Sequence, residues 1–170
     1  MNNENVMQYN DFIKSKQLES DFFGFVIPLN EISADLFDFQ SLIVQWALSK
    51  GRAAIFADTG LGKTGMQLTW ANHVCDYTEG NVLILAPLCV AHQTVKEGIK
   101  FNVPVNYCRS QDGIKSGVNI TNYEMLDKFD LSLFSGVVLD ESSILKSYMG
   151  RTKREIIEAC QSVKYRLACT

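Results

Sequence analysis

The chain has 170 residues, of which 46% are apolar and 21% are charged, and its net charge is −3. This composition is typical of a globular domain with a core of its own, and it excludes an overall basic field that would attract nucleic acid. The polar N-terminus lacks the pattern of a signal peptide, and no apolar run approaches the ~18 residues of a membrane span. We therefore expect a cytoplasmic protein with no membrane partner.

The sequence predicts an N-terminal lead-in segment, residues 1–35, and one main domain, residues 36–170. The lead-in segment has one strong apolar patch, DFFGFVIPL, that would pack on the main domain. The main domain opens with a helix for which Asp38 is a candidate N-cap, and Phe37 and Leu42 have the spacing of a hydrophobic staple. The helical face that we expect to be buried consists of Leu42, Ile43, Trp46 and Ala47.

Short apolar strands alternate with helices along the rest of the main domain. Strands are expected at 52–57, 81–86, 103–107, 118–121, 136–139 and from 165 onwards. Helices are expected from 63 onwards, over 91–99 and around 156–160. This alternation predicts an α/β fold with a mainly parallel central sheet between two layers of helices.

Five cysteines are scattered along the chain, and none forms a C-x-x-C pair. They are Cys75, Cys89, Cys108, Cys160 and Cys169. An odd number of single cysteines on apolar segments favours reduced core thiols over disulfides, and metal ligands normally cluster. We therefore expect no metal site built from cysteine.

The stretch FADTGLGKT lies between an expected strand and an expected helix. Gly60 and Gly62 can expose backbone N–H groups to an anion at the N-terminus of that helix. Lys63 can reach phosphates, and the Thr64 hydroxyl can ligate Mg²⁺. Ala57 replaces the usual first glycine of this signature, and alanine is its smallest substitute. A structural glycine turn is the alternative, but the strand–loop–helix setting favours a P-loop NTPase.

Two adjacent carboxylates, Asp140 and Glu141, follow the expected strand 136–139. Ligands of parallel α/β sheets bind beyond the carboxyl ends of the strands, where the phosphate loop also lies. In such a place Asp140 can hold Mg²⁺ through water, and Glu141 can accept a proton from an attacking water. A plain strand terminator facing solvent is the alternative, and the nearby phosphate loop disfavours it.

Several stretches together resemble the motifs of superfamily 2 helicases. In chain order they are LFDFQ, ADTGLGKT, LILAPLCVAHQTVKEG, ITNYEML, VVLDESSILK and YRLACT. The nearest resemblance is to phage and prophage helicases of the Swi/Snf-like DEAD/DEAH-box type, and it covers residues 36–170. It implies a RecA-like ATP-binding domain that hydrolyses ATP with Mg²⁺ in a bacterial or phage-infected host cytosol.

The resemblance also implies a role for each matching residue. Catalysis would involve Glu141 as general base, together with Asp140 and Lys63, and Gln40 would read the adenine. The residues that would hold ATP are Gln40, Thr59, Gly60, Leu61, Gly62, Lys63 and Thr64. Thr64 and Asp140 would hold Mg²⁺, the latter through water. Those that would contact nucleic acid are Pro87, Leu88, Thr121, Asn122 and Tyr123.

The sequence departs from the family in two respects. Ser142 and Ser143 replace residues that often link motif II to motif III, where Thr170 would couple ATP hydrolysis to nucleic acid. The family also continues into a second RecA-like domain, so we expect this chain to be the first motor domain and to need the second for full activity. The resemblance favours DNA over RNA as the track. The alternative functions are a small P-loop ATPase or kinase, and a non-catalytic module that binds partners in a nucleotide-dependent way.

Overall fold

The structure is a computed structural model that describes residues 23–33, 35–146 and 150–170, without the side chains of residues 150–152. Most of the expected lead-in segment therefore lies outside the described residues. In its described part, Phe25 and Ile32 are buried in the core, and the division into a lead-in segment and a main domain stays a prediction.

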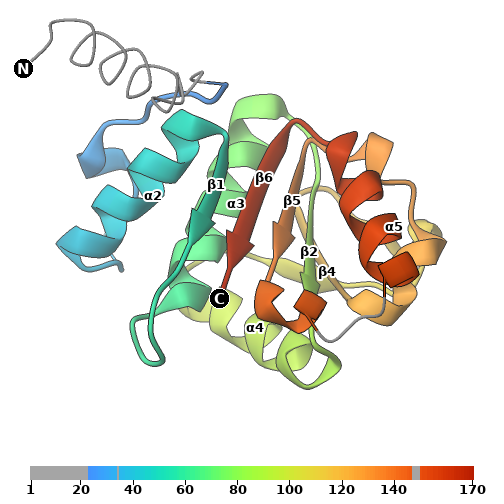
Figure 1. Ribbon diagram of the computed structural model, residues 1–170. Helices are drawn as coiled ribbons and strands as arrows, with labels where there is room; N and C mark the ends of the chain where they lie inside the picture. The colour runs from blue at the N-terminus through green and yellow to red at the C-terminus, as the bar shows by residue number, and fades with distance from the viewer. Residues whose placement is uncertain (1–22, 34, 147–149) are drawn as a thin grey trace, which may run out of the picture.

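A sheet of six parallel strands forms the centre of the molecule, in the order β1-β6-β5-β2-β4-β3 (Figure 1). The strands are β1 (Arg52–Ile55), β2 (Val82–Ala86), β3 (Val105–Tyr107), β4 (Val118–Asn122), β5 (Gly136–Leu139) and β6 (Tyr165–Cys169). All five residues of β2 are buried, as expected for a central parallel strand covered on both faces. The α/β fold with a parallel sheet, predicted from the alternating elements, is confirmed.

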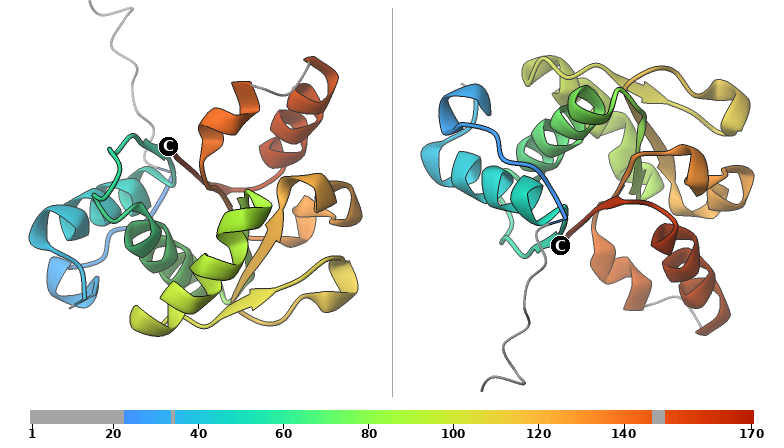
Figure 2. Two further views of the ribbon diagram at one scale, coloured as in Figure 1. Left: turned by 90° about the horizontal axis from the view of Figure 1, so that it is seen from below. Right: turned by 90° about the horizontal axis from the view of Figure 1, so that it is seen from above.

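Helices cover both faces of this sheet, as the two views of Figure 2 show. One face carries α2 (Asp38–Lys50), α3 (Lys63–Thr78) and α4 (Leu88–Lys100), and the other carries α5 (Gly150–Gln161). The 3-10 helices are η1 (Leu29–Glu31), η2 (Gln111–Gly113), η3 (Tyr123–Lys128), η4 (Leu131–Leu133) and η5 (Ser142–Lys146). An apolar cluster fills the space between the sheet and each helical layer, so the fold is three-layered.

Helix α3 holds the phosphate loop against the core because one long side of it is apolar. The residues on this side of α3 are all buried: Met66, Trp70, Ala71, Val74 and Cys75. Full burial of a large apolar side chain stabilises a fold by about 1.5–3 kcal/mol. The first turn of α3, and with it Lys63, is thereby fixed relative to the sheet.

The N-cap, the hydrophobic staple and part of the buried face expected for helix α2 are wrong. The helix begins at Asp38 and its N-cap is Phe37, whose side chain cannot accept a hydrogen bond. Phe37 and Leu42 are 72% and 53% exposed, so they form no buried staple, and Trp46 is 47% exposed. The buried residues are Gln40, Ser41, Val44, Ala47 and Leu48. Of the expected face, Ala47 is therefore buried and Ile43 packs partly against the core, whereas Leu42 and Trp46 lie outside the stripe that packs on α3 and β1.

Candidate functional site

The site lies at the edge of the sheet where β1, β6 and β5 end (Figure 1). Strand β6 pairs with β1 on one side and with β5 on the other. The loop after β1 and the carboxylates after β5 therefore flank the end of β6, where Thr170 lies. Residues that are far apart in the sequence are brought together by this strand order alone.

The loop between β1 and α3 leaves backbone donors free. Gly60 and Gly62 have φ values of 86° and 77°, a conformation that favours glycine. Among the described residues, the N–H groups of Gly60, Gly62 and Lys63 donate to no partner. A Cβ atom at Gly60 would meet no atom within 4 Å, so the space at that point of the loop is open. Free donors at a helix N-terminus form a binding site for phosphate.

Lys63 is half-buried and its ammonium group lies against the loop. Its Nζ donates to the carbonyl oxygen of Ala57 at 2.6 Å and to that of Asp58 at 3.4 Å. The Asp58 carboxylate accepts the Thr59 N–H at 2.7 Å. Both of these acceptors are carbonyl oxygens. The Lys63 ammonium can exchange them for phosphate oxygens, which carry more negative charge.

Gln40 connects helix α2 to the phosphate loop. Its Oε1 accepts the Phe37 N–H at 2.9 Å, and its Nε2 donates to the Leu61 carbonyl at 2.9 Å. A Cβ atom at Gly62 would lie 2.3 Å from the Gln40 Nε2, so the two residues pack closely. Both ends of the Gln40 amide are thus bonded to backbone, and its reading of adenine stays a prediction.

Asp140 is buried next to the phosphate loop, with 7% of its surface exposed. Burial raises the pKa of its carboxyl, whereas the neighbouring Gln67 amide and Lys63 ammonium lower that pKa. The Gln67 side chain is fully buried, and neither of its amide atoms reaches a partner with the distance and angle of a hydrogen bond. The sequence analysis missed Gln67, although a glutamine on the apolar side of α3, one turn after Lys63, was a visible signal.

Glu141 is exposed and has a left-handed backbone with φ of 50°. Its Oε1 accepts the Ser143 hydroxyl at 2.5 Å and the Thr170 hydroxyl at 3.3 Å. Its Oε2 accepts no hydrogen bond from the residues that the structure describes. The carboxylate is thus held at one oxygen and open at the other, as a proton acceptor for a bound water would need to be.

The residues predicted to contact nucleic acid lie in two different environments. Leu88, at the start of α4, is 53% exposed, and Pro87 before it is half-buried. Thr121, Asn122 and Tyr123 are buried, with exposures of 0%, 3% and 4%. Their contacts with nucleic acid stay a prediction, because in this conformation their side chains offer almost no surface to a strand.

Two of these buried side chains are engaged inside the protein. The Tyr123 hydroxyl donates to the Asp140 carbonyl at 2.9 Å, and the Asn122 amide donates to Glu124 at 2.5 Å. The Tyr123 contact links the end of β4 to the carboxylate pair after β5. Tyr123 therefore supports the position of Asp140 from the side of α5.

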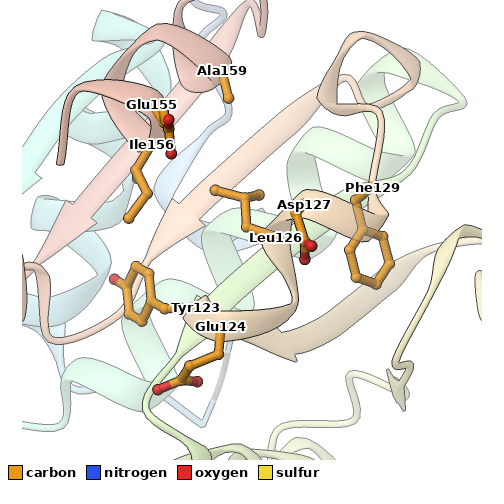
Figure 3. Close-up of a pocket in the computed structure, with 8 residues that line it drawn as sticks. All are labelled: Tyr123, Glu124, Leu126, Asp127, Phe129, Glu155, Ile156 and Ala159. Atoms are coloured by element: carbon orange, nitrogen blue, oxygen red, sulfur yellow. The ribbon is translucent and has the colours of Figure 1, made fainter. Parts of the chain in front are cut away.

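A groove of about 390 Å³ lies between η3 and α5 (Figure 3). Leu126 and Ile156 point toward each other across it, and carboxylates stand at its rim. The described residues that line it are Tyr123, Glu124, Leu126, Asp127, Phe129, Glu155, Ile156 and Ala159. These lining residues include acidic but no basic side chains, and such a lining disfavours a phosphate backbone.

The donors present fit Mg²⁺ and a nucleotide rather than a metal held by protein alone. The described residues contain no group of three or more histidine, cysteine, aspartate or glutamate side chains that could hold an ion. A site with one carboxylate, Asp140, and one hydroxyl, Thr64, suits an ion that takes its other ligands from water and phosphate. Four cysteines are buried and Cys89 is exposed, and all are free thiols. No helix within the described ranges is long and apolar enough to cross a membrane.

The same fold occurs in solved helicase structures. The UvsW helicase of bacteriophage T4 matches with a TM-score of 0.65 and 17% identity, over 77% of this chain and 50% of that chain. The SWI2/SNF2 ATPase core of Sulfolobus solfataricus, solved in complex with dsDNA, matches with a TM-score of 0.64 and 22% identity, over 86% and 34%. The chain therefore has the RecA-like α/β fold that these structures share. The resemblance predicted from the motifs is confirmed at the level of the fold.

The chain spans 50% of the UvsW chain and 34% of the SWI2/SNF2 chain. No protein-family model matches the sequence, and no curated protein matches it. The candidate site is therefore defined by its own geometry, at the edge of the sheet where parallel α/β folds bind ligands.

Proposed function

We propose that this chain is the ATP-binding domain of an ATP-dependent DNA helicase or translocase. The observation that carries the proposal is the arrangement around the end of β6. A phosphate loop with free N–H donors stands on one side, and the Asp140–Glu141 pair stands on the other. This is the distribution of charge that phosphoryl transfer needs, because its catalysis consists largely of positioning and charge neutralisation.

Each part of the site has a role in this reaction. The N–H groups of Gly60, Gly62 and Lys63, with the Lys63 ammonium, bind the phosphates, and the neighbouring Thr59 and Leu61 complete the loop. Thr64 and Asp140 hold Mg²⁺, the latter through water. When bound, Mg-ATP supplies an electrophilic γ-phosphorus. Glu141 orients the attacking water and accepts the proton that the water loses.

DNA is the track that the comparisons favour, since the SWI2/SNF2 core was solved with dsDNA. Exposed Leu88, with Pro87 beside it, is the part of the predicted track that a strand could reach. A second RecA-like domain would close over the ATP and complete the motor, so the full-length protein is the proper sample for function.

The test is the ATPase rate of the full-length protein with Mg²⁺, measured alone and with single-stranded DNA, duplex DNA and RNA. We expect DNA to raise the rate, and we expect the 170 residues alone to bind ATP weakly and to unwind nothing. A rate that no polymer changes would contradict the motor and favour a simple P-loop ATPase. Stimulation by RNA alone would contradict the choice of DNA.

A further inference from the structure

Glu141 is held by two hydroxyl groups that come from different parts of the chain. Ser143 lies on η5, just after the carboxylate pair, and Thr170 follows β6. Both donate to the same carboxylate oxygen, Oε1, at 2.5 Å and 3.3 Å. Hydrogen bonds to an ionised carboxylate are stronger than neutral ones, and two of them on one oxygen fix the plane in which the other oxygen lies.

Glu141 is exposed, and its backbone has a left-handed φ of 50° just after β5. An exposed glutamate with no restraint samples several staggered rotamers, most of which would direct Oε2 away from any one point. The two hydroxyls select one rotamer out of this set.

Thr170 also connects the carboxylate to the phosphate loop. Its backbone N–H donates to the Ile55 carbonyl, and its carbonyl accepts the Ala57 N–H at 3.1 Å. The carbonyl of the same Ala57 accepts the Lys63 ammonium at 2.6 Å. A continuous series of hydrogen bonds thus runs from Lys63 through Ala57 and Thr170 to Glu141.

We propose that Ser143 and Thr170 are positioning residues that hold Glu141 by Oε1 and so direct Oε2 toward the water that attacks ATP. This inference rests on the proposed ATP hydrolysis. It gives a function to Ser143 at a position where the sequence departs from the related helicases. Through the hydrogen bonds of Thr170, a movement of Lys63 on phosphate binding can change the position of the Glu141 carboxylate.

The neighbouring Ser142 provides a matched control, because it has the same side chain but its hydroxyl makes no hydrogen bond with the described residues. The experiment compares Ser143→Ala, Ser143→Thr and Ser142→Ala in the full-length protein with DNA and Mg²⁺. The measurements are kcat and KM for ATP and, separately, the Kd of a fluorescent ATP analogue. Thr170→Val and Thr170→Ser form a second pair of variants, which tests the other hydroxyl. This pair keeps the inference testable if the Ser143 variants do not fold.

We expect Ser143→Ala to lower kcat by about 10- to 100-fold, the scale of a misplaced reacting group, with KM and the analogue Kd unchanged. Ser143→Thr should restore most of kcat, Ser142→Ala should match the wild type, and Thr170→Val should lower kcat where Thr170→Ser does not. Equal kcat for Ser143→Ala and Ser142→Ala, or a loss of analogue binding in step with kcat, would overturn the inference alone. A wild-type protein that binds the analogue but hydrolyses no ATP would overturn the proposed function and the inference with it.

Discussion

The carboxyl ends of β1 and β5 expose polar groups, whereas the carboxyl end of β4, in the same sheet, buries its polar groups. After β1 the N–H groups of Gly60 and Gly62 donate to no partner among the described residues, and after β5 Glu141 is exposed. At the end of β4, Thr121 and Asn122 are buried. The resemblance assigns ligand contacts to all three strand ends, but only the ends of β1 and β5 have polar groups on the surface.

The cause of the difference is the backbone that follows each strand. The turn after β1 has two glycines with positive φ, and Glu141 after β5 also has a positive φ. The segment after β1 therefore presents backbone N–H donors, and the segment after β5 presents a carboxylate. After β4 the chain enters η3 directly, and Tyr123 is bonded to the Asp140 carbonyl. The end of β4 therefore acts as a support for the site.

The largest effect is expected at the phosphate loop. Lys63→Ala removes the only side-chain ammonium that contacts the loop within the described part of the chain. We expect nucleotide affinity to fall and turnover to fall by about 10²-fold or more, because a charge that neutralises phosphate is lost. Isothermal titration and a steady-state ATPase assay measure both. The control is Lys96→Ala, at an exposed position. Equal nucleotide affinity and turnover in the two variants would show that the loop after β1 does not bind the nucleotide through Lys63.

The next effect concerns the loop conformation. Gly62→Ala should destabilise the protein by about 1–2 kcal/mol from its left-handed backbone, and further because the new Cβ would lie 2.3 Å from Gln40 Nε2. Gly60→Ala has similar backbone strain but open space, so it should cost less. Thermal unfolding measures both, and Gln40→Ala should recover part of the Gly62→Ala loss. Equal losses in the two glycine variants would show that Gln40 does not pack against the loop.

A smaller effect is expected at the end of β4. Thr121→Val replaces a fully buried hydroxyl that makes no hydrogen bond. Stability should be unchanged or rise by about 1 kcal/mol, because an unsatisfied polar group is removed, and DNA affinity should not change. Leu88→Ala, at an exposed position, should weaken DNA binding instead. A loss of DNA affinity in Thr121→Val would mean that β4 opens to the strand.

The smallest effect concerns the reactivity of the cysteine thiols with an alkylating reagent. Burial raises the pKa of the Cys75, Cys108 and Cys160 thiols to about 11 and that of Cys169 to about 12, so they stay protonated at pH 8. Only thiolates react quickly. Mass spectrometry after brief alkylation should therefore show modification of exposed Cys89 in the folded protein and of all five thiols in denaturant. Fast modification of Cys169 would show that the end of β6 opens.

Local patterns predicted most of the fold, because buried apolar runs define the strands. A phosphate loop needs only consecutive residues, so Gly60 to Thr64 could be proposed from the sequence, and their binding of phosphate stays a prediction. The face of α2 was predicted only in part, because apolar side chains such as Leu42 and Trp46 also lie outside the stripe that packs on α3 and β1, and apolarity alone does not show which side packs. The burial of Thr121 and the contact between Ser143 and Glu141 depend on how separate segments pack, which no local pattern records.

The most direct test of the account is a single-turnover experiment on Glu141→Gln in the full-length protein. Enzyme in excess over ATP, with Mg²⁺ and DNA, separates binding from hydrolysis in one sample. The account predicts wild-type nucleotide binding with hydrolysis slowed by about 10²–10⁴-fold, the usual contribution of a general base. Hydrolysis by Glu141→Gln at the wild-type rate would contradict the assignment of Glu141 and, with it, the proposed site.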